Sequence, residues 1–194
     1  MSFKEYVYSV LIVSNNENFN AHFSSALKGM EYQPIHYVNS VNEAQRKTLE
    51  RQYDIVIINT PLLDDFGIKF AIDLSINNTS IVLIFVRNEL YDAIYEKVYE
   101  YGIFTIRKPT MNQTIIQSLD WLKATRERLR KMENKSLSLK EKMEEIKLVN
   151  RAKWTLINAL QMSEKEAHRY IEKQAMDRSI TKKEIAEIII KTYK

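Results

Sequence analysis

Short, uncharged apolar runs alternate with amphipathic stretches over the first 110 residues, and this alternation constrains the fold more than any other feature. Five runs rich in β-branched residues predict buried strands at residues 9–13, 35–38, 54–58, 81–86 and 103–106. Helical spacing between them predicts helices at 17–29, 41–50, 68–74 and 90–101. Strands that are apolar on both faces and alternate with helices indicate a parallel sheet covered on both sides. The predicted fold class of this part is therefore α/β.

A heptad pattern follows, because the chain reads as helix from Met111 almost to residue 160. Apolar positions alternate at spacings of three and four residues over four heptads, which is typical of a coiled coil. We predict a homodimer through a seam whose apolar members are Leu122, Leu129, Met132, Leu139, Met143 and Ile146. The polar positions Thr125, Ser136 and Asn150 interrupt this seam and would help to fix its register. The alternative is a single amphipathic helix that packs back on its own domain.

The last segment contains two capping boxes, Ser163-x-x-Glu166 and Thr181-x-x-Glu184, which mark the starts of two helices. They divide this segment into the end of the long helix, to about Leu160, and helices at 164–176 and 182–192. The whole chain is therefore predicted as α/β plus all-α. We expect a sheet domain at residues 1–120, a coiled-coil helix at 121–150 and a small three-helix domain at 151–194.

Charge is divided unevenly along the chain, whose net charge is +4. Residues 122–194 hold 19 of the 29 Lys and Arg residues and 11 of the 25 Asp and Glu residues, so this part carries +8 and the rest −4. This asymmetry favours a polyanionic partner for the C-terminal part. The residues expected on that surface are Arg151, Lys153, Lys165, Arg169, Lys173, Gln174, Arg178, Lys182 and Lys183. The alternative is that these charges only solvate helices.

Several function classes are excluded by composition. The chain has no cysteine, so it can form neither disulfides nor thiolate metal sites, which fits a cytoplasmic protein. No apolar run is long enough for a membrane span, and the N-terminus lacks the pattern of a secretion signal. No nucleophile–base pair, metal-ligand cluster or glycine-rich phosphate loop is present, so we expect no enzyme, metal or cofactor.

Residues 8 to 120 resemble the receiver domain of bacterial response regulators, a flavodoxin-like fold, and Lys108-Pro109 matches that family's lysine-proline pair. The resemblance implies a carboxylate pocket that binds magnesium and accepts a phosphoryl group. Here Ser14 and Asn15 replace the first carboxylates, Asn59 stands at the phosphoacceptor position, and Phe85 replaces a hydroxyl residue. Because an amide cannot form an acyl phosphate, we predict a pseudo-receiver that is controlled by a protein partner.

Residues 151–190 resemble the ANTAR domain, an RNA-binding module of bacterial transcription antiterminators. The matching residues are Ala152-Lys153, Ser163 to Ala167, Gln174 to Asp177 and Thr181 to Ala186. The resemblance implies recognition of paired, short-loop hairpins in nascent mRNA, and the lost phosphoacceptor resembles the phosphorylation-independent members that act in amide operons. Two departures are Trp154 and Gln161, which stand where the family commonly has glycine.

Two other functions compete with RNA binding. Three helices after a receiver-like domain could form a helix-turn-helix of a DNA-binding transcription factor. No glycine-containing turn joins the last two predicted helices, which favours RNA. The third possibility is a pure interaction protein.

Overall fold

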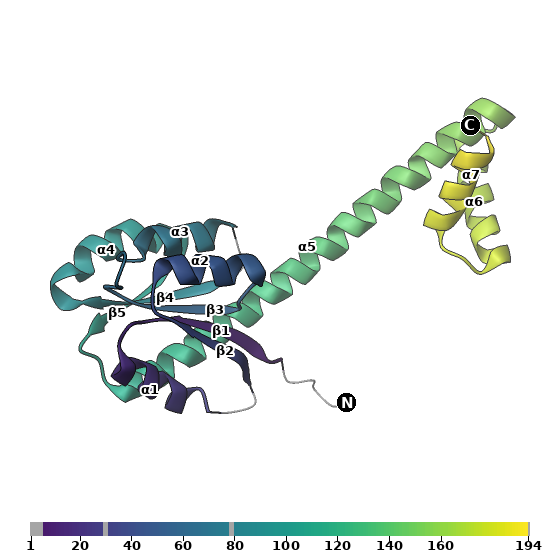
Figure 1. Ribbon diagram of the computed structural model, residues 1–194. Coiled ribbons are helices and arrows are strands. Elements are labelled where there is room, and N and C mark those ends of the chain that lie inside the picture. Colours follow the sequence, from purple (N-terminus) through teal and green to yellow (C-terminus); the bar gives the residue numbers. More distant parts are fainter. Residues whose placement is uncertain (1–5, 29–30, 78–79, 194) are drawn as a thin grey trace. The chain divides into compact units, whose positions relative to one another are not determined.

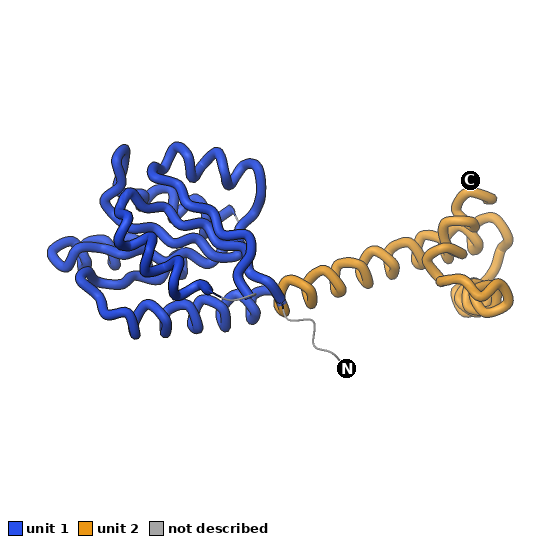
Figure 2. Tube along the Cα trace, turned by 60° about the horizontal axis from the view of Figure 1, so that its bottom comes forward, with its two compact units in different colours: residues 1–130 blue, residues 131–194 orange. Residues whose placement is uncertain are grey.

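The computed structural model describes residues 6–28, 31–77 and 80–193. The chain forms two compact units, Met1–Arg130 and Lys131–Lys194, which are described separately below. Figure 2 shows them in different colours. The boundary between the units lies inside the segment predicted as a coiled-coil helix.

The first unit contains a parallel sheet of five strands in the order β2-β1-β3-β4-β5 (Figure 1). The strands are β1 (Tyr8–Val13), β2 (Tyr32–Val38), β3 (Ile55–Asn59), β4 (Ile81–Arg87) and β5 (Phe104–Lys108). Each corresponds to one of the apolar runs, so the predicted α/β fold class is confirmed for this part. β2 begins three residues earlier than predicted, because the pairing with β1 already starts at Tyr8 and Tyr32.

Helices cover both faces of the sheet (Figure 1). One face packs against α2 (Val41–Glu50), α3 (Ile68–Asn77) and α4 (Tyr91–Val98). The other face packs against α1 (Glu17–Ala26) and the first part of α5 (Asn112–Leu160). Alternate strand residues feed the two cores: Leu11 and Val13 face the first, whereas Val10 and Ile12 face the second.

The ends of one predicted helix differ from those in the structure, and the end of another cannot be compared. Residue 29, the predicted end of the first helix, lies outside the described residues. The helix predicted at 90–101 is α4 flanked by two 3₁₀ turns, η1 (Asn88–Leu90) and η2 (Tyr99–Tyr101). Gly102 ends the second turn in the left-handed conformation, with φ of 69°.

The first part of α5 belongs to the core of the first unit. Leu122 is buried there beside Ile115 and Leu119, and Leu129 packs against the same cluster. Leu122 and Leu129 were expected in a dimer seam, but both side chains pack inside their own unit. The remaining seam residues, Met132, Leu139, Met143 and Ile146, are 54–60% exposed, and we call them the exposed seam.

A buried ion pair holds α5 against the sheet. Arg126 on α5 donates from Nε to Asp54 Oδ1 over 2.9 Å, and each side chain is 10% exposed. Asp54 Oδ2 accepts from the backbone N–H and the hydroxyl of Ser9, each at 2.9 Å, and the Tyr6 hydroxyl donates to Oδ1. The carboxylate therefore has a partner on each oxygen, which is what a buried charge requires.

The second unit is built from the end of α5 with α6 (Glu164–Arg178) and α7 (Lys182–Thr192). Both predicted capping boxes are formed, at Ser163 with Glu166 and at Thr181 with Glu184. A small core joins the three helices through Ala152, Leu156, Ala167, Ile171, Ala175, Ile185, Ala186 and Ile189. Gln161 adopts φ of 54°, a left-handed conformation that glycine adopts more readily than other residues.

Within the part of the chain that the structure describes, no helix has both the length and the apolar character needed to cross a membrane.

Replacing Asp54 by Asn should strongly destabilise the first unit, because the Arg126 charge would stay buried without its partner. Breaking a buried pair in this way costs about 3–5 kcal/mol. Trp121 lies in the first unit and Trp154 in the second, and the chain has no other tryptophan. Urea unfolding followed by tryptophan fluorescence in a Trp154→Phe background therefore reports on the first unit.

The matched control is Asp92→Asn, because Asp92 pairs with Arg107 at 2.9 Å but its side chain is 81% exposed. That change should cost less than about 1 kcal/mol. Equal losses for Asp54→Asn and Asp92→Asn would contradict the importance of the buried pair.

Burial alone would raise the pKa of the Asp54 carboxyl, but the hydrogen bonds from Ser9 and Arg126 outweigh it and hold the pKa below its ordinary value. This stabilisation is present above pH ~4 and is lost as the pH falls through the lower folded-state pKa.

Candidate nucleic-acid interface

The pocket at the carboxyl edge of the sheet is closed by hydrogen bonds between three side chains. Lys108, at the end of β5, donates to Asn59 Oδ1 over 2.6 Å and also to the Thr60 carbonyl. The Asn59 amide donates in turn to Ser14 Oγ over 3.0 Å. Asn59 is 4% exposed and Ser14 is fully buried, whereas Lys108 is only partly buried. Burial, with the Arg87 charge nearby, lowers the pKa of Lys108.

The other residues of this pocket supply no carboxylate. Asn15 is exposed beyond the end of β1. Phe85 lies in the core, where its ring meets those of Phe19 and Phe23 edge-on at 5.0 and 5.5 Å. Among residues 6–28, 31–77 and 80–193, no group of three or more His, Asp or Glu side chains could hold a metal ion. The site thus keeps the lysine of a receiver pocket and lacks the acidic residues.

Asp64, in the loop after β3, has a structural task. Its carboxylate accepts from the backbone N–H groups of Val41 and Asn42, at 2.9 and 3.0 Å, and so caps the first turn of α2. These hydrogen bonds lower the pKa of Asp64. Asp65 accepts from the Gly67 N–H in the same loop.

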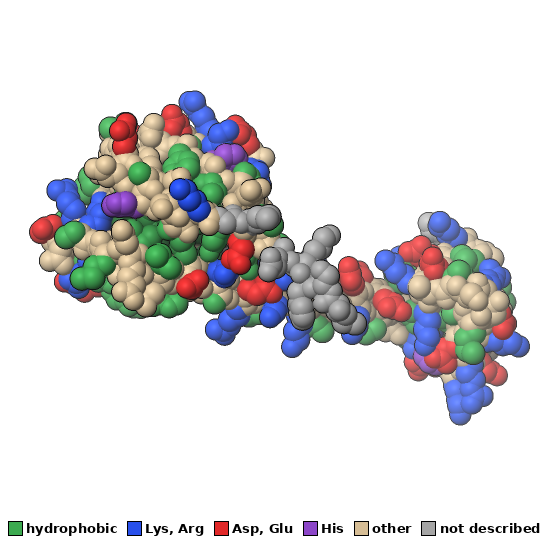
Figure 3. All heavy atoms as spheres, turned by 90° about the horizontal axis from the view of Figure 1, so that it is seen from below, with side chains coloured by type: hydrophobic (Ala, Val, Ile, Leu, Met, Phe, Trp, Pro, Cys, Tyr) green, Lys and Arg blue, Asp and Glu red, His purple; other side chains and the backbone are tan. Residues whose placement is uncertain are grey.

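The second unit carries a stripe of cations on α6. Lys165, Arg169 and Lys173 are all exposed, and we call them the basic stripe. Each stands two positions before a buried core residue of α6, so the stripe lies on the side of the helix turned away from the core. Among the described residues, none of the three has an ion-pair partner. Figure 3 shows basic side chains around this unit, with acidic ones between them.

Two other predicted lysines are tied to carboxylates. Lys153 lies 2.9 Å from Glu164, and Lys182 lies 2.6 Å from Glu172. His168 also approaches Glu172, at 3.4 Å. Lys153 and Lys182 line one cavity of about 380 Å³. The two ion pairs were not predicted from the sequence. Each lysine is 10 or 11 residues from its glutamate, and only the packing of α5, α6 and α7 brings them together.

Gln174 and Arg178 lie in a different place, a groove between α6 and α7 that the rings of Tyr170 and Tyr193 also line. Tyr193 was not predicted as a site residue, since nothing in its local sequence distinguishes it. Arg151 and Lys183 are exposed on α5 and α7, and Trp154 is 65% exposed. The predicted residues therefore occupy more than one face of the unit.

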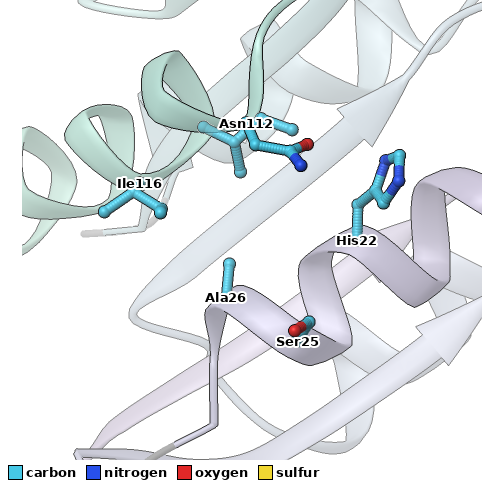
Figure 4. A pocket seen from close by; sticks show the side chains of 6 residues that line it. His22, Ser25, Ala26, Asn112 and Ile116 are labelled. Carbon is cyan, nitrogen blue, oxygen red and sulfur yellow. The ribbon is translucent and has the colours of Figure 1, made fainter.

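A further small groove lies between α1 and α5 in the first unit (Figure 4). It encloses about 190 Å³, and its lining includes His22, Ser25, Asn112 and Ile116. No carboxylate, lysine or arginine lines it, so it offers little charge for binding or chemistry.

Residues 137–190 match the ANTAR domain family. The match starts within the second half of α5, includes Leu139, Met143 and Ile146, and ends near the end of α7. Three of the four residues of the exposed seam therefore lie within the matched segment.

A relative matches along almost the whole chain. The transcriptional regulatory protein PdtaR of Mycobacterium tuberculosis is 23% identical over 184 residues, which cover 94% of this chain and 89% of PdtaR. The same protein from strain H37Rv matches equally well.

Solved structures resemble the first unit. The signal receiver domain of an HD-domain protein from Pseudomonas fluorescens Pf-5 superposes with a TM-score of 0.58, at 16% identity, over 68% of this chain and 96% of that domain. The chemotaxis response regulator CheY4 of Vibrio cholerae gives a TM-score of 0.52, at 17% identity, over 60% of this chain and 98% of CheY4. At these identities the likeness establishes the receiver fold alone. The chain thus joins a C-terminal segment that matches the ANTAR domain family to a domain with the receiver fold.

Proposed function

We propose that this transcription antitermination regulator binds paired short-loop hairpins in nascent mRNA through its ANTAR domain, as a homodimer. The observation that carries the proposal is the basic stripe on α6, whose three cations face away from the core without carboxylate partners. Unpaired Lys and Arg side chains in one row suit the evenly spaced phosphates of a nucleic acid. Lys153 and Lys182 are weaker candidates, since a phosphate would have to displace Glu164 and Glu172.

Dimer formation is supported by the exposed seam. Four apolar side chains on one stripe of α5, each more than half exposed, would be costly to leave in water. A second copy with the same stripe could cover them as a coiled coil. Two ANTAR domains in one particle would then hold two hairpins at once.

We further propose that the receiver-fold unit responds to a partner protein and not to phosphorylation. Asn59 and Lys108 already satisfy each other, and an amide offers no oxygen that can form an acyl phosphate. A surface for such a partner is available on α4 and the η2 turn after it, where Tyr91, Tyr95 and Tyr99 stack at centroid distances of 5.8 and 5.7 Å. Tyr95 and Tyr99 are about half exposed, and aromatic residues of this kind are enriched at protein interfaces.

DNA binding is the second candidate. The connection between α6 and α7 is only residues 179–181, as short as in a helix-turn-helix. It contains no glycine, but Ser179 adopts the left-handed φ of 53° that glycine commonly supplies. The experiment must therefore include duplex DNA.

A synthetic two-hairpin RNA should bind the purified protein more tightly than a single hairpin or a duplex DNA of equal length. The physical reason is that a dimer can engage both hairpins, so the second contact is intramolecular. Fluorescence anisotropy at several salt concentrations measures both affinity and the number of phosphates contacted. Equal, weak binding to all three would contradict RNA recognition, and preference for the duplex would favour the DNA-binding candidate.

The basic stripe is tested in the same assay. Arg169→Ala with Lys173→Ala should reduce the slope of log affinity against log salt by about 2. The matched control is Lys69→Ala with Lys97→Ala, which removes two positive charges from the first unit. If both double variants behave alike, the stripe is the wrong surface.

Replacing Leu139 by Lys should convert the dimer to monomers, because the charge would enter the apolar seam. Leu137 provides a matched control: it is 60% exposed, against 54% for Leu139, but it lies off the seam on the same helix. Leu137→Lys should therefore leave the dimer intact. Analytical ultracentrifugation gives the mass of each, and full-strength binding to the two-hairpin RNA by a monomeric Leu139→Lys variant would refute the role of the seam.

Incubation with acetyl phosphate and magnesium should leave the mass of the protein unchanged. The pocket has an amide at the acceptor position, and Asp64 is engaged in capping α2. Intact-protein mass spectrometry detects the expected absence of an adduct, with an active response regulator as the positive control. A stable phosphoryl adduct on any aspartate would contradict the proposal that this unit is not phosphorylated.

A further inference from the structure

The groove between α6 and α7 is lined by both apolar and polar side chains. We call Ile185, Ile188 and Ile189 its floor, and Gln174 and Arg178 its rim. The rings of Tyr170 and Tyr193 also line it. It encloses about 160 Å³. A cavity of roughly 150 Å³ is large enough for one six-membered aromatic ring. The groove thus has the size for a single flat ring and the composition of a binding site.

Its polar side chains are free to bind. Among the described residues, the Gln174 amide, the Arg178 guanidinium and the two tyrosine hydroxyls form no hydrogen bond with another protein group. By contrast, Lys153 and Lys182, on the same unit, already have carboxylate partners. Four unpartnered polar groups around an apolar floor favour a ligand that is flat and apolar on its faces and polar on its edge.

A nucleobase has these properties. Its face can stack on a tyrosine ring, and its edge offers donors and acceptors that a glutamine amide or an arginine guanidinium can pair with. An apolar side chain from a protein partner would cover Gln174 and Arg178 without pairing them, which costs free energy.

Charge in the neighbourhood favours the same ligand. Lys173 belongs to the basic stripe and immediately precedes Gln174, so the stripe and the groove lie on neighbouring faces of α6, about 100° apart. A strand whose phosphates lie along the stripe could turn one base into the groove. Arg178 adds a further positive charge at the rim.

We propose that the α6–α7 groove holds one unpaired base from the loop of the RNA hairpin. This inference rests on the proposed function, and it goes further by separating the two contacts. The basic stripe binds the backbone of any hairpin, whereas the groove, through Gln174, Tyr170 and Tyr193, selects the loop.

The test combines protein variants with abasic RNA. A hairpin series carries an abasic nucleotide at each loop position in turn, and its affinity is measured with the full-length protein. For the wild type, one abasic position should weaken binding about ten-fold. Gln174→Ala should weaken binding to the intact hairpin by a similar factor, and combining it with that abasic position should cause little further loss.

Two additional variants guard against simple misfolding. Tyr193→Leu keeps an apolar side chain beside the core and removes the ring, so it should reproduce the loss for the same loop position. Met176→Ala is the control, because Met176 lies on α6 at 79% exposure and does not line the groove. Circular dichroism and thermal unfolding check that all variants are folded.

The outcomes separate the two proposals. Additive losses at every loop position, or wild-type affinity for both groove variants, would overturn the groove while hairpin binding stands. No binding of any hairpin by the wild type would overturn the proposed function and the groove with it. A loss that appears at one loop position and disappears in Gln174→Ala would support the groove.

Discussion

The buried pair between Asp54 and Arg126 joins α5 to the sheet shortly before the first unit ends at Arg130. Arg126 is 72 residues from Asp54 in sequence, and both side chains are nearly buried. Two isolated charges in such a place would destabilise the fold, because neither is solvated. The backbone and hydroxyl of Ser9 and the hydroxyl of Tyr6 complete the hydrogen bonds of the carboxylate. Leu129 then packs against the core of the first unit, and the exposed seam follows on α5 before the helix enters the second core near Leu148.

Hydrogen bonds at the carboxyl edge of the sheet connect three strands through side chains that are not carboxylates. Ser14, Asn59 and Lys108 retain the hydrogen-bonded connection between β1, β3 and β5, so the strands keep their positions. An amide in place of a carboxylate accepts from the lysine and donates to the serine, which an ionised carboxylate cannot do. The Asn59 amide thus satisfies both the Ser14 hydroxyl and the Lys108 ammonium group.

The polar residues of the second unit lie in three different environments, which its composition does not distinguish. Lysines beside Glu164 and Glu172 help to hold the three helices together around a small core. The basic stripe has no such partners and points away from that core. The α6–α7 groove keeps unpaired polar groups over isoleucines. A count of Lys and Arg residues treats these three environments alike, although only in the last two do the cations lack a carboxylate partner among the described residues.

The sequence by itself determined the elements. Strand runs, the long helix and both capping boxes are local patterns, since the periods of strands and helices depend on neighbouring residues only. The prediction that the pocket cannot accept a phosphoryl group likewise rests on the identity of a single residue, Asn59. Only the tertiary structure decided that Leu122 and Leu129 serve the first core, that Lys153 and Lys182 are paired, and that Tyr193 meets Gln174 and Arg178 at one groove. These contacts join residues from different helices and strands, and which face of one element meets another depends on packing that no local pattern contains.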